Sequence, residues 1–401
     1  MNAAGPRRQR VEILLLLGSL STMGAASTDL YVPALPAIAN DLNVAQSGTQ
    51  LTITTFFIGL AAGQIATGSI SDVLGRRRPL VAGSVLYVVA ALACALAPSL
   101  LLLAAGRLLM GFAASSGVVV SRAIVRDLFS GIEAARAFSR MFLVLGMAPM
   151  VAPLIGSQIL KVTSWRGIFL VLAAFGVVLL VASFLRLPET LPAERRRPAT
   201  LGATAATFRM LLTSARFTGY ALPIACTVGM FVASLASVPF VVQDVYGHSP
   251  QTFAAMFFVI GLVMMVISQL NARLVQTVDP RRLLLVGAVT QLAGALLVLA
   301  VGDRGIWPFF LCLLVALPWW GFVVANSTAL AMRDYAAVAG AASALIGLGQ
   351  YGLSAVGAPL TGIAGHGSVR ALGIVMTGFA ATALALASLT VAGDRRRAAR
   401  V

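Results

Sequence analysis

The sequence predicts an all-α integral membrane protein with twelve transmembrane helices in two pseudo-symmetric six-helix halves. Three observations lead to this prediction. Of the 401 residues, 59% are hydrophobic and only 10% charged, and the mean hydropathy of +0.94 is outside the usual range of soluble domains. Apolar runs long enough to cross a bilayer recur from near the N-terminus almost to the C-terminus. One long polar connection near the middle divides these runs into two sets of six.

Charges, prolines and glycines mark where each expected helix begins and ends. The first six helices are expected at 13–38, 49–70, 79–97, 100–122, 138–160 and 167–187. The second six are expected at 217–242, 252–272, 283–301, 306–330, 338–362 and 370–392. The N-terminal half is therefore 1–187, the linker 188–216 and the C-terminal half 217–401. The first run is interpreted as a membrane span, because no small-residue cleavage site follows it.

The distribution of positive charge predicts the topology. The net charge is +16, but the basic residues lie in short clusters between spans, which argues against a nucleic-acid partner. When alternate loops are assigned to alternate sides, 24 of the 29 basic residues fall on one side and four on the other, with Arg107 inside a span. Positive charge marks the cytoplasmic face. Both termini and the linker are therefore expected in the cytoplasm.

Metal and redox chemistry are not expected. Cys94, Cys226 and Cys312 fall in different spans and are interpreted as small packing residues. His248 and His366 lie in two outer loops far apart in the sequence, so no metal site is predicted.

Asp29 is the candidate proton site, with Arg107 as its partner. Asp29 is the only charge in the apolar stretch 13–38, where a carboxylate costs roughly 2.5 to 3.5 kcal/mol to insert. At 1.5 Å per residue, Asp29 lies roughly 13 Å and Arg107 roughly 10 Å from the outer ends of their spans. The similar depth predicts an Asp–Arg pair that couples proton binding to transport, with a static salt bridge as the alternative.

The loop between spans two and three contains Gly68, Asp72, Gly75 and Arg76. Asp72 and the following arginines form a charge cluster at a tight turn, which predicts a latch that holds one conformation. The alternative is a structural turn whose arginines only anchor the loop on the cytoplasmic side. The spacing matches the loop signature G-x-x-x-D-x-x-G-R-[RK] and therefore resembles the major facilitator superfamily.

Span five contains Gly146, Pro149, Pro153 and Gly156. The two prolines lie on one helix face and remove backbone hydrogen bonds, while the glycines permit close packing. The segment resembles a motif found in facilitator antiporters and predicts a seal. The alternative is an ordinary kinked packing helix.

Further strings extend the resemblance along the chain to drug:proton antiporters with twelve spans, specifically the bicyclomycin and chloramphenicol resistance (Bcr/CflA) family. These strings are Thr28–Pro36, Ser121–Asp127, Asn271–Leu274, Ala325–Ala329 and Gly340–Gly347. The resemblance implies proton-driven efflux of antibiotics or related hydrophobic compounds from a bacterial cytoplasmic (inner) membrane. It implies a functional monomer whose energy source is the proton gradient, with no cofactor. Asp29 and Arg107 match the family's acidic first-helix and basic fourth-helix positions.

The chain also departs from the family pattern. Met110 stands where the fourth-helix motif often has Gln, and Ser21 and Thr22 are neutral where some exporters have a second carboxylate. A scheme that exchanges two protons therefore has no second site in span one.

Substrate is expected to bind near the midplane between the halves. Aromatic and amide side chains inside spans are the candidate contacts, because they offer apolar area and adaptable hydrogen bonds. They are Tyr31, Gln64, Gln269, Trp319, Trp320, Asn326 and Gln350.

The sequence bears on three functions other than efflux. A channel would need a pore loop or a ring of repeated charges, and the sequence has neither. An enzyme would need a dyad or a metal-spaced cluster, which the spans do not contain. A proton-coupled uptake carrier for a small metabolite remains the alternative.

Overall fold

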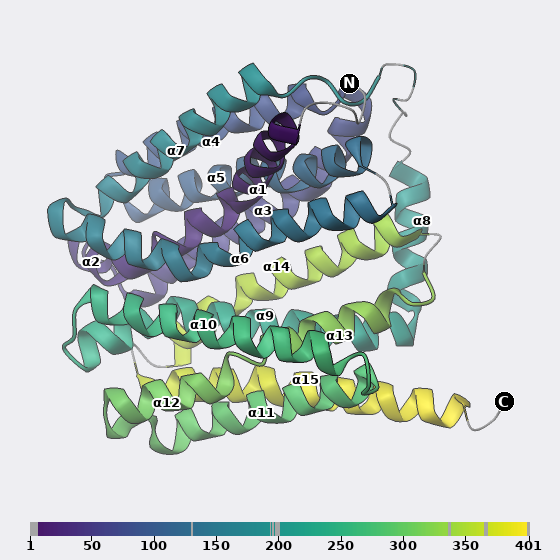
Figure 1. Ribbon diagram of the computed structural model, residues 1–401. Coiled ribbons are helices and arrows are strands. Elements are labelled where there is room, and N and C mark those ends of the chain that lie inside the picture. The colour runs from purple at the N-terminus through teal and green to yellow at the C-terminus, as the bar shows by residue number, and fades with distance from the viewer. Residues whose placement is uncertain are drawn as a thin grey trace. The chain divides into compact units, whose positions relative to one another are not determined.

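The computed structural model describes residues 7–129, 131–192, 194, 196, 201–335, 338–364 and 368–398. Within these ranges the regular structure is helical and contains no strand. Contacts divide the chain into two compact units (Figure 1). Unit 1 comprises residues 1–44 and 55–199, and unit 2 comprises residues 45–54 and 200–401.

The helices up to residue 186 are long, except for the short α2, which follows a break after α1. They are α1 (Arg7–Asp29), a 3-10 turn (Val32–Ala34), α2 (Leu35–Asp41), α3 (Gln46–Leu74), α4 (Arg77–Ala95), α5 (Leu100–Leu128), α6 (Gly131–Val162) and α7 (Trp165–Arg186). In unit 1, α1 packs against α5 and α6, and α4 packs against α5 and α7.

Apart from residues 45–54, which include the start of α3, unit 2 comprises the linker helix α8 (Leu201–Thr213) and seven further α-helices. They are α9 (Ala215–Phe240), extended by a π-helical turn (Val241–Val245), α10 (Pro250–Leu274), α11 (Pro280–Val301), α12 (Ile306–Ala316), α13 (Trp320–Met332), α14 (Ala339–Ala364) and α15 (Val369–Ala398). A 3-10 turn (Gly302–Arg304) precedes α12. Within the unit, α9 packs against α13, α14 and α15, and α11 packs against α13 and α15.

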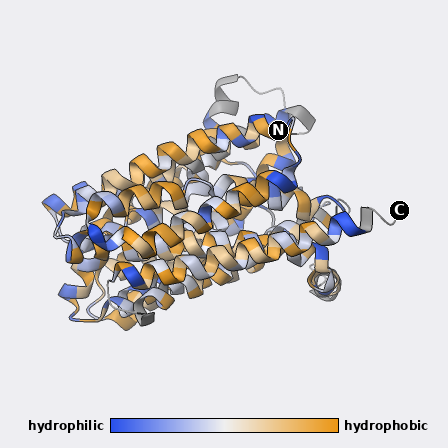
Figure 2. Ribbon diagram, turned by 90° about the horizontal axis from the view of Figure 1, so that it is seen from below, coloured by the Kyte–Doolittle hydropathy of each residue, from blue (hydrophilic) through white to orange (hydrophobic). Residues whose placement is uncertain are grey.

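Ten segments among the described residues are long and apolar enough to cross a membrane. Hydrophobic residues cover most of the helix lengths, and strongly hydrophilic residues concentrate near helix ends (Figure 2). The spans expected at 138–160 and 338–362 fall within α6 and α14, which include side chains outside the described set. The protein is therefore a multi-pass helical membrane protein, and the count of twelve spans stays a prediction.

The first span differs from the continuous helix expected at 13–38. Regular α-helix ends at Asp29, and the chain passes through the Val32–Ala34 turn before α2 begins. Pro33 and Pro36 explain the break, because neither has the backbone N–H that would bond to Asp29 or to Val32 in a continuing α-helix. Asp29 is thus the last residue of a helix that ends within the span Glu12–Asp41.

The span expected at 306–330 is also broken. It consists of α12 and α13, which are separated at Leu317–Trp319 around Pro318. The missing N–H of Pro318 accounts for this interruption.

A close approach of α3 and α5 shapes the core of unit 1. A side chain at Gly111 on α5 would collide with the backbone carbonyl of Phe56 on α3. Small residues at such contacts let membrane helices pack backbone to backbone. The contact holds Phe56 beside the preceding turn of α5, which contains Arg107.

Candidate functional site

Arg107 lies on α5 and is fully buried. Its Nη1 donates a hydrogen bond of 2.7 Å to the backbone carbonyl of Ser27 on α1. The guanidinium carbon lies 4.6 Å from the ring centroid of Tyr31 and 4.3 Å from that of Phe56. Contacts of this kind between a cation and an aromatic face are each worth about 2 kcal/mol when desolvated. Tyr31 is therefore the one predicted substrate contact that the structure places against Arg107.

The Ser27 carbonyl accepts this bond because α1 ends two residues later. The Tyr31 N–H, which would bond to Ser27 in a continuing α-helix, donates instead to the Thr28 carbonyl at 3.2 Å. Carbonyls in the last turn of a helix lack intrahelical partners and carry the negative end of the helix dipole. The end of α1 is thus a partial counter-charge for the buried guanidinium.

Tyr87 on α4 fixes the same turn of α1. The Ser27 hydroxyl donates to the Met23 carbonyl at 2.5 Å and shares a hydrogen bond of 2.7 Å with the Tyr87 hydroxyl. Because the Ser27 proton is used by Met23, Tyr87 is the donor of the shared bond. Three helices, α1, α4 and α5, therefore meet at Ser27.

The expected ion pair between Asp29 and Arg107 is wrong for this structure. Both residues are buried and described, yet no ion pair or hydrogen bond joins them. The physical reason is the helix end, which presents the Ser27 carbonyl to Nη1 while Tyr31 and Phe56 flank the guanidinium. Within the described residues, Arg107 Nε and Nη2 have no hydrogen-bond partner. The site thus contains a buried carboxylate and a buried cation that do not neutralise each other directly.

The span-five motif packs on the residue that follows Asp29. Gly156 on α6 lies so close to the Leu30 carbonyl that any side chain there would collide with it. Pro149 and Pro153 lie inside the same helix. Gly146 also falls within α6 but outside the residues whose surroundings the structure describes. Gly156 therefore packs directly against the chain at the break in α1.

The loop motif forms a charge cluster centred on Arg76, whose side chain is 10% exposed. Arg76 bonds to Asp72 at 2.6 Å and to Asp127, near the end of α5, at 3.0 Å. Its Nη1 also donates to the Ser71 hydroxyl at 3.0 Å. The predicted charge cluster at the turn thus includes Asp127, which sequence spacing did not indicate.

Glu189, beyond the end of α7, supplies the missing N-terminal cap of α4. The helix has no side-chain cap of its own, and the Glu189 carboxylate accepts hydrogen bonds from the backbone N–H groups of Arg76 and Arg77, at 2.8 and 3.2 Å. Burial raises the pKa of Glu189, but the N–H groups of Leu191, Arg76 and Arg77 and the charge of Arg196 lower it, and the net pKa falls below 4.5. A carboxylate at a helix N-terminus is stabilised by the unpaired N–H groups and the dipole.

Gly75 is required at this cap for two reasons. Its φ of +91° lies in the left-handed region, which residues with a side chain rarely adopt. A Cβ at this position would also collide with the Glu189 carboxylate. A Cβ placed on Gly68, the first residue of the motif, would lie 4.0 Å from the Val119 side chain on α5, which is an ordinary contact distance.

Comparison with known proteins identifies the family. Residues 15–359 match the family model described as Major Facilitator Superfamily. The chain belongs to this superfamily. It is accordingly a membrane transporter rather than an enzyme.

Relatives of this facilitator include drug-resistance proteins. It is 37% identical to an uncharacterized MFS-type transporter of Bacillus subtilis, YdgK, over 89% of this chain and 90% of the relative. It is 31% identical to a bicyclomycin resistance protein homolog of Haemophilus influenzae, covering 86% and 87%. It is 29% identical to a chloramphenicol resistance protein of Pseudomonas aeruginosa, covering 83% and 79%. The resemblance to the Bcr/CflA family is confirmed.

Solved structures support the facilitator fold. A bacterial homolog of the human lysosomal transporter Spinster, in an inward-facing and occupied conformation, superposes with a TM-score of 0.77 at 15% identity, covering 98% of each chain. At this identity the likeness concerns the fold alone.

The other predicted substrate contacts of this facilitator lie on several elements. In unit 1, Gln64 is half-buried on α3. In unit 2, Trp319 lies in the break before α13 and Trp320 is the first residue of α13, and the Trp319 ring packs edge-on against Phe322 with centroids 4.9 Å apart. Gln269 is exposed on α10, and Gln350 is half-buried on α14.

Asn326 has a local structural contact. Its amide donates to Asn271 on α10 at 2.8 Å and to the Phe322 carbonyl at 2.8 Å. The bond joins α13 to α10 inside unit 2. A role of Asn326 in substrate binding stays a prediction.

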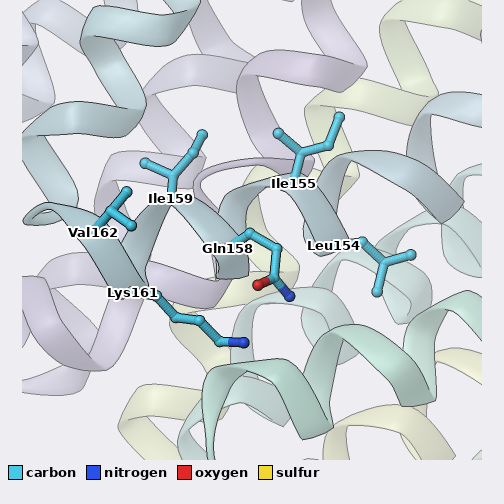
Figure 3. Close-up of a pocket in the computed structure, with 6 residues that line it drawn as sticks. All are labelled: Leu154, Ile155, Gln158, Ile159, Lys161 and Val162. Carbon is cyan, nitrogen blue, oxygen red and sulfur yellow. The ribbon is translucent and has the colours of Figure 1, made fainter.

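A surface depression on α6 lies apart from the Arg107 site. It is lined by Leu154, Ile155, Gln158, Ile159, Lys161 and Val162, all from one helix (Figure 3). Its lining is mainly aliphatic, with Ile155 46% and Val162 85% exposed. Exposed aliphatic residues on a membrane helix are typical of a lipid-facing surface.

Proposed function

We propose that this facilitator is a proton-coupled antiporter that exports antibiotics or related small hydrophobic compounds by alternating access. The observation that carries the proposal is Asp29, a buried carboxylate at the broken end of α1 without an ion pair among the described residues. The names of the relatives from Haemophilus influenzae and Pseudomonas aeruginosa support drug resistance as the outcome.

Asp29 supplies the proton-binding step. An ionised carboxylate inside a membrane protein costs free energy unless it is paired, and binding a proton removes that cost. When alternating access exposes Asp29 to water, hydration of the carboxylate lowers the same cost and favours release of the proton. Transport is coupled if substrate and proton favour opposite states of this site.

Arg107 supplies a fixed positive charge in the same half. Its bond to Ser27 leaves the N–H groups of Nε and Nη2 free to donate to a new partner when α1 moves. In this account, Arg107 stabilises the ionised state of Asp29 in a conformation other than the one described here. The gradient of protons is then the only energy source, and no cofactor takes part.

The proposed setting is the cytoplasmic membrane of a bacterium. The arginines of the linker and of the loop 76–78 lie on the cytoplasmic side according to the positive-inside rule, as do both termini. The transporter is proposed to act as a monomer with lipid, protons and a small molecule as its partners.

Drug accumulation in cells tests the direction of transport. A bacterial host deficient in efflux is given labelled chloramphenicol or bicyclomycin, with and without the protein. Export predicts less accumulation with the protein, and a protonophore should abolish the difference. Asp303→Asn, which removes an exposed carboxylate in the turn before α12, should lower accumulation as the wild type does. Greater accumulation with the protein would contradict export and favour the uptake carrier.

A further inference from the structure

Unit 2 contains a second charge cluster, centred on Asp394 near the end of α15. The Asp394 side chain is only 7% exposed. Its Oδ2 accepts hydrogen bonds from the Tyr220 hydroxyl at 2.8 Å and from Arg281 Nη2 at 3.2 Å. Its Oδ1 lies 3.3 Å from Arg216 Nε. One buried carboxylate therefore binds the first turns of both α9 and α11.

Arg216 extends the cluster to a fourth helix. It also forms an ion pair with Asp334, which lies two residues beyond the end of α13. Asp279 caps α11 by accepting the Arg281 backbone N–H at 2.8 Å. The starts of α9 and α11 and the ends of α13 and α15 are thus joined through four side chains, Arg216, Arg281, Asp334 and Asp394.

The two clusters occupy corresponding positions in their units but have opposite central charges. In unit 1 a buried cation, Arg76, lies before α4 and is bonded to Asp72 and Asp127. In unit 2 a buried anion, Asp394, is bonded to two arginines, one of them at the start of α11. Both α4 and α11 are the third long helix of their half, and an Arg–Arg pair lies at the start of each, Arg76–Arg77 and Arg281–Arg282.

The linker is attached to both clusters. At its beginning, Glu189 binds the backbone of Arg76, and the Thr190 hydroxyl donates to Asp127 at 3.1 Å. At its end, Arg216 binds Asp334 and Asp394. Each end of the segment 188–216 is therefore anchored in the charge cluster of its own unit.

We propose that Asp394 is the positioning residue of an ion-pair clamp that fixes the ends of α9, α11, α13 and α15. The clamp keeps these helix ends in register, so that unit 2 moves as one body, and it fixes the point where the linker joins α9. Facilitators are built to rock rigid bundles around a central site, which requires helix ends that do not separate. Removing the anion leaves two arginines close together with only the more exposed carboxylates Asp334 and Asp279 as partners, and loss of the buried member of such a cluster is unfavourable. The proposal is independent of the substrate and of the coupling ion.

Distance measurements within unit 2 test the clamp. Spin labels are placed at Arg333→Cys, beyond the end of α13, and Arg396→Cys, on α15, both of which are exposed. Cys94, Cys226 and Cys312 are replaced by Ala in the full-length protein. The parent should give one narrow distance distribution. Asp394→Asn should broaden it, and Asp394→Glu, which keeps the charge, should restore a distribution close to the parent.

Two further variants complete the test. Tyr220→Phe removes only one hydrogen bond and should broaden the distribution less than Asp394→Asn. It replaces Asp394→Asn as the test variant if Asp394→Asn does not fold. Asp72→Asn, in the cluster of unit 1, should leave this distance unchanged. An unchanged distribution in both Asp394→Asn and Tyr220→Phe would overturn the clamp. Equal broadening by Asp72→Asn would also overturn it, because the effect would then reflect general loosening of the protein.

Discussion

Arg107 donates its hydrogen bond to the backbone carbonyl of Ser27, 2.7 Å away, rather than to the carboxylate of Asp29. The buried cation therefore faces the end of a helix instead of an acidic side chain. This arrangement depends on the break in α1, which leaves the Ser27 carbonyl without its usual partner. It also leaves Asp29 available for a proton, which is what a coupling site requires.

Replacing Arg107 with methionine should abolish transport without a large loss of stability. In the described conformation the cation has no ion pair, so removing it relieves a desolvation cost while leaving the Ser27 carbonyl unpaired. The relief is about several kcal/mol for a buried ion, and it opposes the loss of the Ser27 bond, about 1–3 kcal/mol, and of the two cation–π contacts with Tyr31 and Phe56, about 2 kcal/mol each. The melting temperature of purified Arg107→Met should stay near that of the wild type. A stability loss of about 3–5 kcal/mol would instead indicate a buried Asp29–Arg107 ion pair.

Glu189 should make the loop cluster sensitive to acid. Its pKa is lowered in the folded protein, so its stabilising contribution is fully present above its unfolded-state pKa, near 4.5. The contribution is lost as pH falls through the lower, folded-state pKa. Melting temperature is measured between neutral pH and pH 3. Glu189→Gln should be less stable at neutral pH, and its deficit relative to the wild type should shrink in acid. A constant deficit across this range would contradict the capping role.

The two acidic partners of Arg76 should differ in their effect on stability. The Asp72 side chain is 58% exposed and that of Asp127 only 19%, and Asp127 also binds Thr190. Exposed ion pairs contribute about 0–1 kcal/mol. Asp127→Asn should therefore lower the melting temperature more than Asp72→Asn. The reverse order would show that burial does not determine the strength of these pairs.

Asp72→Ala should impair the transport cycle while sparing drug binding, because the latch lies at the helix ends and away from the Arg107 site. Drug affinity and transport rate are measured side by side. A parallel loss of both would point to a binding or folding defect.

Gly156 should tolerate no side chain. Even one methyl group would collide with the Leu30 carbonyl at the break in α1. We expect Gly156→Ala to lower the melting temperature and Gly156→Leu to lose export with a proton leak, measured as pH decay in proteoliposomes. Gly378→Ala is the matched control, because a Cβ at Gly378 on α15 meets open space. If the two alanine variants are equally stable and Gly156→Leu exports normally, the interpretation of the span-five motif as a seal is wrong.

The sequence predicted the features that depend on local pattern. Apolar runs, arginine clusters and the loop signature indicated the helices, the turn at Gly75 and the place of Asp29 and Arg107 inside spans, while the coupling role of these two residues stays a prediction. They do not pair in the described conformation, because depth along an ideal helix does not reveal where that helix ends. Pro33 and Pro36 were the available signal for the break.

Contacts between distant residues were not predictable from pattern. Glu189 caps a helix 113 residues earlier in the chain, and no periodicity records such a partner. The Asp394 cluster was also missed, because its members come from the ends of four helices. The available signal was the Arg281–Arg282 pair, which lies at the start of the third long helix of its half as Arg76 and Arg77 do.

The central claim is that Asp29 carries the proton that drives export. Purified protein in proteoliposomes is given an imposed pH gradient and whichever of chloramphenicol and bicyclomycin the cells export, and drug movement and internal pH are followed together. The account predicts coupled exchange by the wild type and by Asp303→Asn. It predicts none by Asp29→Asn, which keeps the size of the side chain but cannot titrate and should still bind the drug. Transport by Asp29→Asn at the wild-type rate, driven by the pH gradient, would contradict the account.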